Sequence, residues 1–203
     1  MKPKIILCLA LLTVSLAQPI AADQSTATKL GESKHIPSPV KGLSLTYSWS
    51  GWTDDVGSDL QAVLNRVVGN TGSTLWILKA QGMAMEFSWS PDAHYLLVGI
   101  VQPNHGMVLD VVDTHAEPIK ERDLQLAAVE KQVAAQLPTR YAGAFAHHSQ
   151  IDFDHVEWTS STQCRLHYIY EFDRHAGGAI LDLDLSEANP QLKIVRVTPR
   201  PEP

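Results

Sequence analysis

The densest group of side chains that could bind a metal or act in catalysis lies between residues 147 and 155. It contains three histidines and two aspartates: His147, His148, Asp152, Asp154 and His155. Imidazole nitrogens and carboxylate oxygens are common ligands of zinc and other divalent metals. Catalytic triads are assembled across a fold and not along the chain, so the lack of a local motif is only weak evidence against an enzyme. One hypothesis is therefore a hydrolase, with or without a metal, that uses this region.

The spacing within this group favours a structural interpretation. It matches no familiar metal-binding motif, and residues 151–158 alternate between polar and apolar types as a strand does. On such a strand Asp152 and Asp154 would share a face with His148, whereas His155 would point the other way. A solvated polar face is the primary interpretation. A metal site formed by the two adjacent histidines and the two aspartates is the minor hypothesis, so we predict no cofactor.

Motifs that identify common enzyme classes are missing from the sequence. Gly-x-Ser-x-Gly, Ser-x-x-Lys, His-Glu-x-x-His and glycine-rich phosphate loops are all absent. Three aspartates, Asp110, Asp182 and Asp184, could pair for acid–base work. Each alternates with leucine, which favours a role in keeping one face of a sheet soluble. We predict no catalytic residue. A hydrolase that uses the region from His147 to His155 is the alternative function.

A turn-rich loop at 51–57 carries the best candidate for a protein-binding site. Its residues are Trp52, Asp54 and Asp55. Large aromatic side chains anchor protein interfaces, and carboxylates at the rim steer a basic partner toward them. The alternative is that Trp52 only covers the core.

We predict strands at 43–49, 74–80, 85–89, 95–101 and 108–113, and the first and third of them alternate clearly between apolar and polar residues. Ser90-Pro91-Asp92 predicts a turn after the third of these strands. The run at 95–101 is almost continuously apolar, which predicts a strand covered on both faces.

Two segments carry helix signals. In residues 58–68, Ser58 and Gln61 have the spacing of a capping box, and an apolar stripe follows at Leu60, Val63, Leu64 and Val67. In residues 123–137, Asp123 is the predicted cap and Pro138 the stop, with a stripe at Leu126, Val129, Val133 and Leu137.

The second half of the chain repeats the pattern of the first. Trp158 follows Trp89 at a spacing of 69 residues, and Ile180-Leu181-Asp182 follows Val108-Leu109-Asp110 at 72. Because the spacing grows only across turns, a duplication is indicated. We predict an α+β protein of tandem helix-plus-antiparallel-meander units. The runner-up is two propeller-like β blades, because Trp89-Ser90-Pro91-Asp92 before an apolar strand is similar to turns in many propeller blades.

These patterns divide the chain into four segments. Residues 1–22 have the layout of a secretory signal peptide, with Lys2 and Lys4 before a twelve-residue apolar run. Residues 23–42 read as a flexible leader. The two predicted repeats are 43–120 and 121–203, the latter ending in a proline-rich tail. Only Cys164 lies after the signal, so an internal disulfide is excluded from a cleaved chain and we expect this thiol to be buried in a strand.

Charge narrows the classes of partner. Without the two signal lysines the chain has fourteen basic and twenty-two acidic side chains, a formal charge of −8. A net negative field argues against nucleic acid and anionic membranes and is compatible with a basic protein. The signal-like segment at 1–22 predicts a secreted or periplasmic protein without a stable membrane anchor. It would act by protein contact as an inhibitor, immunity-type protein or envelope assembly factor.

Overall fold

The computed structural model describes residues 32–53, 57–103, 106–136, 148–172 and 175–199. Over these residues the chain forms twelve strands and one helix. They are β1 (Glu32–Ile36), β2 (Leu43–Thr53), β3 (Gly57–Val68), β4 (Thr71–Gly82), β5 (Ala84–Trp89), β6 (Tyr95–Gln102), β7 (Gly106–Asp113), β8 (Lys120–Asp123), α1 (Leu126–Gln136), β9 (His148–Trp158), β10 (Gln163–Phe172), β11 (His175–Asp184) and β12 (Leu192–Pro199). None of the described helices is long and apolar enough to cross a membrane.

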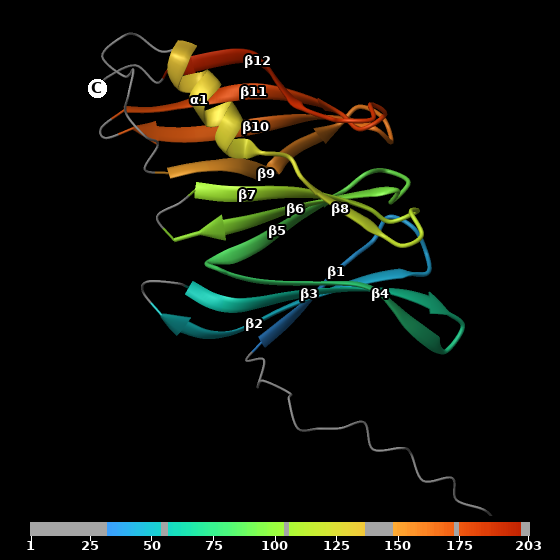
Figure 1. Cartoon of the computed structure of the whole chain (residues 1–203). Coiled ribbons are helices and arrows are strands. Elements are labelled where there is room, and N and C mark those ends of the chain that lie inside the picture. The colour runs from blue at the N-terminus through green and yellow to red at the C-terminus, as the bar shows by residue number, and fades with distance from the viewer. Residues whose placement is uncertain (1–31, 54–56, 104–105, 137–147, 173–174, 200–203) are drawn as a thin grey trace, which may run out of the picture.

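The strands form three antiparallel sheets, each a meander of four consecutive strands. We call β1–β4 the first sheet, β5–β8 the middle sheet and β9–β12 the third sheet. The sheets are stacked in that order, as Figure 1 shows from bottom to top. The first strand of each sheet, β1, β5 or β9, is an edge strand, and the last strand forms the opposite edge.

Two hydrophobic cores hold the stack together. Between the first and middle sheets the core includes Leu45, Leu64 and Leu96, all fully buried. Between the middle and third sheets it includes Leu97, Leu109 and Leu166, also fully buried. Strand β6 contributes alternate residues to both cores, which confirms the prediction of a strand covered on both faces.

The predicted α+β architecture is wrong: the fold is mostly β, with a single short helix among the described residues. The runner-up of two blades is also wrong in number, because the described residues form three sheets. Residues 58–68, predicted as the first helix, form β3. Leu60, Ala62 and Leu64 are buried while their neighbours are more exposed, which is the period of a strand. Pairing with both β2 and β4 along nearly its whole length outweighs the local helix signal.

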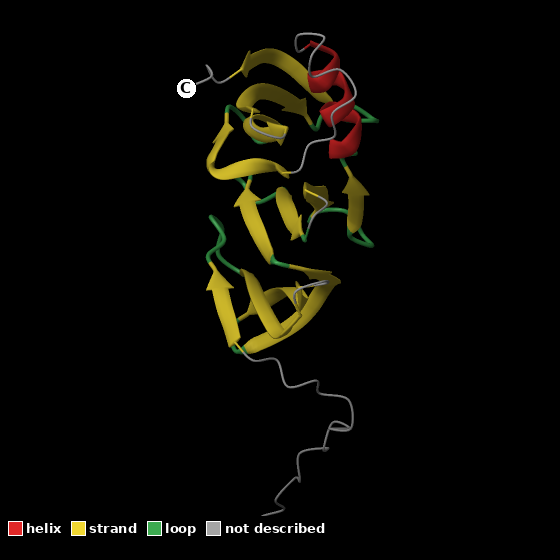
Figure 2. Cartoon of the chain, turned by 90° about the vertical axis from the view of Figure 1, so that its left-hand side faces the viewer, coloured by secondary structure: helices red, strands yellow, loops and turns green. Residues whose placement is uncertain are grey.

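The second helix prediction is confirmed in position, although α1 begins three residues after the predicted cap. Asp123 instead accepts a hydrogen bond from the amide of Gln125, 2.7 Å away, in the turn before the helix. Leu126, Val129 and Val133 are buried as predicted, and the helix packs against β12 and β7. Figure 2 shows α1 beside the third sheet and no equivalent helix at the first.

The meander repeat is present, but its register differs from the prediction. The amide of Ser90 donates to the carbonyl of Tyr95 after β5, and that of Thr159 donates to Gln163 after β9. In the next turns, Thr114 donates to His94 and Leu185 donates to Thr162. Residue 114 is thus equivalent to residue 185, a spacing of 71 and not 72. A shift of one residue turns every side chain of a strand to the other face, so Asp110 is equivalent to Leu181 and not to Asp182.

Candidate functional site

A groove of about 650 Å³ is lined by the edge strands of all three sheets. Residues of β1, β5 and β9 line it together with Pro37, Tyr47 of β2 and Ile169 of β10. Strand β1 contributes Lys34 and Ile36, β5 contributes Met85, Glu86 and Phe87, and β9 contributes residues 150–154. The stacking of the sheets therefore creates the groove from segments that lie more than a hundred residues apart in the sequence.

One wall of the groove is aromatic and held in place by packing. The ring of Tyr47 stacks on Trp49 at a centroid distance of 5.0 Å and meets Phe87 at 5.6 Å. Its hydroxyl oxygen accepts a hydrogen bond from the amide of Met85 at 3.3 Å. Burial raises the pKa of Tyr47, so the hydroxyl is neutral at physiological pH. This wall offers a fixed apolar surface to a ligand.

The other wall is acidic. Three of the residues that line the groove carry carboxylates, namely Glu86, Asp152 and Asp154. The basic residue of the lining is Lys34. Burial raises the pKa of Glu86, and the negative charges of Asp154 and Asp152 raise it further. A cationic group placed among these carboxylates would relieve their repulsion. The groove is therefore suited to a ligand with both apolar and positively charged groups.

A bulge in β9 places the two aspartates. Glu157 pairs with Arg165 and Asp152 pairs with His167, so four residues of β9 lie opposite a single residue of β10. The Asp152 carboxylate accepts the amide of Asp154 at 3.2 Å and the Nδ1–H of His155 at 2.7 Å. Because of this bulge, the prediction that His155 points away from Asp152 is wrong.

The structure leaves most of the predicted site residues without a test. Asp54 and Asp55 lie outside the described residues, and Trp52 is the second-last residue of β2, with a side chain that is not described. His147 is likewise outside them, and the side chain of His148 is not described. Among the described residues, no three histidine, cysteine, aspartate or glutamate side chains are arranged to hold a metal ion. The metal hypothesis stays a prediction because it needs both histidines.

Two aromatic residues of β10 belong to the core. Tyr168 and Tyr170 are 1% and 2% exposed and face the middle sheet. Cys164 on the same strand is buried, as predicted, and burial raises its pKa to about 12, so the thiol is not reactive at neutral pH. The sequence signal for this burial is the alternation along β10, in which every second residue from position 164 to 170 faces the core: Cys164, Leu166, Tyr168 and Tyr170.

Sequence reasoning missed Glu86 as a site residue. Its alternation with Met85 and Phe87 correctly identifies a polar face of the strand. Nothing in the nearby sequence indicates that β9 lies opposite that face.

No protein-family model matches the chain, and no characterised protein is similar enough in sequence to count as a relative.

Proposed function

We propose that this protein acts by contact with another protein and that the groove binds a basic, apolar segment of that partner. The observation that carries the proposal is the placement of Glu86, Asp152 and Asp154 beside the wall formed by Tyr47 and Phe87. A lysine or arginine side chain satisfies both walls, because its methylene stem packs on apolar surface while its charge reaches a carboxylate. The excess of acidic over basic side chains in the whole chain supports attraction of the same partner.

The edge of β9 favours recognition through side chains over the addition of a partner strand. An added strand needs a regular row of free amides and carbonyls. At the bulge the amide of Asp154 is already bonded to Asp152, and charged side chains stand on both sides of it. Bulges and charges are the features by which edge strands avoid pairing with other strands. The groove then recognises its ligand through pockets and charges.

Within this proposal the protein works in the periplasm or outside the cell, as an inhibitor, an immunity-type protein or an envelope assembly factor. The support is the signal-like layout of residues 1–22 together with the lack of a catalytic motif. A reporter fused to residues 1–30 tests the export step. We expect the reporter to cross the inner membrane with loss of about twenty-two residues, and an exported reporter with an intact N-terminus would contradict the signal.

The groove is tested with defined peptides and methyl NMR of the mature chain. A peptide that alternates lysine and leucine should shift the methyl signals of Met85 and Ile169, both of which line the groove. The double variant Glu86→Gln, Asp154→Asn should weaken this binding roughly tenfold or more, mainly by slowing association. A matched peptide with glutamate in place of lysine should not bind.

Asp59→Asn is the matched control, because Asp59 is an exposed carboxylate on β3 that does not line the groove. It should bind the lysine peptide like the natural protein. Equal affinity for all three proteins, or shifts confined to other methyl groups, would reject the groove as the binding site. A partner recovered from envelope extract should then be retained by Asp59→Asn and lost by the double variant.

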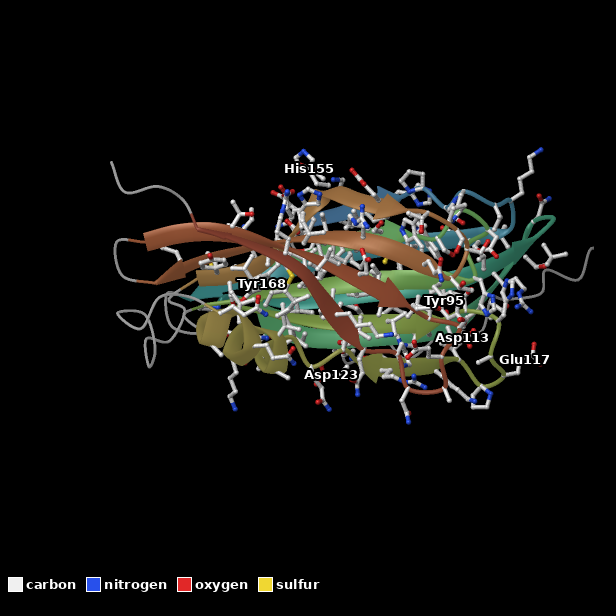
Figure 3. The ribbon with its side chains drawn as sticks, turned by 90° about the horizontal axis from the view of Figure 1, so that it is seen from above. Tyr95, Asp113, Glu117, Asp123, His155 and Tyr168 are labelled. Atoms are coloured by element: carbon white, nitrogen blue, oxygen red, sulfur yellow. The ribbon has the colours of Figure 1, made fainter. Side chains whose placement is uncertain are left out.

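One observation favours the hydrolase alternative. The 2.7 Å bond between His155 and Asp152 has the geometry of a base and its orienting carboxylate. The side chain of His155 is 63% exposed and lies at the edge of the molecule in Figure 3, and within the described residues no serine, threonine or cysteine bonds to its ring. Turnover of an ester or peptide panel that disappears in His155→Ala would favour the enzyme. Turnover that survives this change would exclude the pair as its base.

A further inference from the structure

Asp110 occupies a core position of the middle sheet. It pairs with Val98 on β6 and with Asp123 on β8, and it is only 6% exposed. Its equivalent in the third sheet is Leu181, which is fully buried. Leu109 and Val111 on either side belong to the core toward the third sheet, so Asp110 faces the first sheet. A carboxyl group therefore stands where the repeat places a leucine.

The Asp110 carboxyl has no hydrogen bond or ion pair to any described residue, although more than nine-tenths of the residue is buried. Its charged neighbours have the same sign. Asp123 is its cross-strand partner, and Glu121 lies two residues away on the same face of β8. Glu121 accepts a hydrogen bond from the Nε1–H of Trp76 at 2.8 Å, which joins β8 to β4 of the first sheet.

No basic side chain among the described residues neutralises this group. Arg122 lies on the other face of β8 and donates to the carbonyl oxygen of Ala188 at 3.1 Å. On β4 the residues that pack toward the middle sheet are apolar, and Lys79 is exposed on the opposite face. On β6 the partner is Val98. Asp110 thus faces two carboxylates and an apolar surface.

We propose that Asp110 is a proton-binding site that controls how tightly the first and middle sheets hold together as pH changes. With its proton, the carboxyl is a neutral group that the apolar surface of the first sheet tolerates. Without it, a negative charge is buried beside Glu121 and Asp123. Repulsion then acts on β8, which is a short edge strand and carries the hydrogen bond to Trp76. Loss of the proton loosens this junction.

The direction of the pH effect follows from the folded and unfolded affinities for the proton. Burial raises the pKa of Asp110 to about 6, and the charges of Glu121 and Asp123 contribute to the rise. In the unfolded chain the group titrates near its ordinary value of about 3.9. The stabilisation from proton binding is therefore fully present below about pH 4 and is lost as the pH rises through about 6. His94 and His115, which stack at 4.3 Å beside Asp113, lie in the turns at the end of the same sheet and do not face Asp110.

Urea unfolding of the full mature chain between pH 4.5 and 8 tests the proposal. Asp110→Asn keeps the shape and removes the titration. We expect the unfolding equilibrium constant of the natural protein, relative to that of Asp110→Asn, to rise roughly tenfold or more between pH 5 and pH 7.5. Asp182→Asn is the control, because Asp182 is half exposed and paired with Arg165 at 3.0 Å. It should not remove the pH dependence, and parallel curves for the natural protein and Asp110→Asn would overturn the proposal.

A second measurement needs no variant and locates the effect. The carboxyl carbon of Asp110, followed by NMR in the natural protein, should titrate with a midpoint near 6. Hydrogen exchange of the β8 amides should quicken over the same range beyond the ordinary effect of pH, whereas the amides of β11 should show no such change. A midpoint near 4, or equal changes in β8 and β11, would reject the site.

Discussion

The middle and third sheets have the same four-stranded path and equivalent turns, yet their strands follow different side-chain rules. Strand β6 is apolar at nearly every position because sheets cover both of its faces. Its equivalent β10 alternates, with Leu166 and Tyr168 in the core and Arg165 and His167 on the other side. The hydrogen-bonded backbone is thus shared, and the number of covering sheets decides which residues each strand carries.

The comparison also explains where polar residues are located in the two sheets. The outer face of the third sheet carries Asp182 and Asp184, both satisfied by neighbours such as Arg165 and Gln163. The equivalent face of the middle sheet is buried against the third sheet. Asp110 of the middle sheet is instead on the face toward the first sheet, and its carboxyl group lacks a partner among the described residues. Equivalent strands can therefore place aspartates in opposite environments.

The largest effect is expected from giving the third sheet the residue of the middle sheet. Leu181→Asp should lower the free energy of unfolding at pH 7 by about 4 kcal/mol or more, because it removes a fully buried leucine and buries a carboxylate. Urea unfolding followed by circular dichroism measures the loss. A cost below about 1 kcal/mol would contradict the burial of Leu181 on which the expected loss rests.

The next effect concerns the two equivalent tryptophans. Trp89 packs toward the first sheet and Trp158 toward the middle sheet, both partly buried beside their cores. Trp89→Ala and Trp158→Ala should each cost roughly 3 kcal/mol of unfolding free energy. Urea titrations of the two variants should agree within about 1 kcal/mol. A change that proves harmless in one sheet alone would break the equivalence of the two positions.

The reverse exchange should stabilise the protein. Asp110→Leu at pH 7.5 should raise the free energy of unfolding by about 1 to 2 kcal/mol, because it removes a buried charge and matches the leucine of the third sheet. The gain should shrink at pH 5, where the natural carboxyl holds its proton. Thermal and urea unfolding at the two pH values measure it, and a loss of stability at pH 7.5 would contradict the comparison.

Much of the strand pattern could be predicted from sequence, but the way the sheets stack could not. Alternation and the Ser90-Pro91-Asp92 turn identify β5 to β7, and the apolar stripe with Pro138 identifies α1. Residues 58–68 mislead because Leu60, Val63 and Leu64 fit a helical stripe as well as a strand. The choice depends on pairing with β2 and β4, which are partners that a local pattern does not contain.

The residues of the candidate groove could not be predicted from local sequence patterns either. Glu86 and Asp154 lie 68 residues apart, and only the packing of β5 against β9 brings them to one groove. The bulge at 153–156 reverses the orientation that regular alternation predicts for His155. Gly177 and Gly178 lie inside β11, where a side chain on Gly177 would meet the hydroxyl of Tyr170. The groove thus depends on contacts between residues distant in sequence, and the bulge depends on the pairing of β9 with β10.

A smaller effect separates the two tryptophans by their polar groups. Trp158 donates its Nε1–H to Ser88 at 3.0 Å across the sheet interface, whereas the Nε1 of Trp89 is buried without a partner among the described residues. Trp158→Phe should therefore cost about 1 kcal/mol more than Trp89→Phe, since it alone breaks a hydrogen bond. A double-mutant cycle with Ser88→Ala isolates this bond. A coupling energy near zero between Trp158 and Ser88 would show that the contact adds nothing to stability.

The smallest effect should come from the outer face of the third sheet. Arg165 and Asp182 form an ion pair at 3.0 Å, with side chains 44% and 47% exposed. Water and salt screen a pair so exposed, and ordering two side chains offsets what attraction remains. Arg165→Ala, Asp182→Ala and the double variant should unfold at the same urea concentration as the natural protein, at low and at high salt. Asp110 and Asp182 both lie on strands with a neighbour on each side, but only Asp110 is covered by another sheet. A clear loss of stability in Asp182→Ala would therefore mean that burial is not what distinguishes the two aspartates.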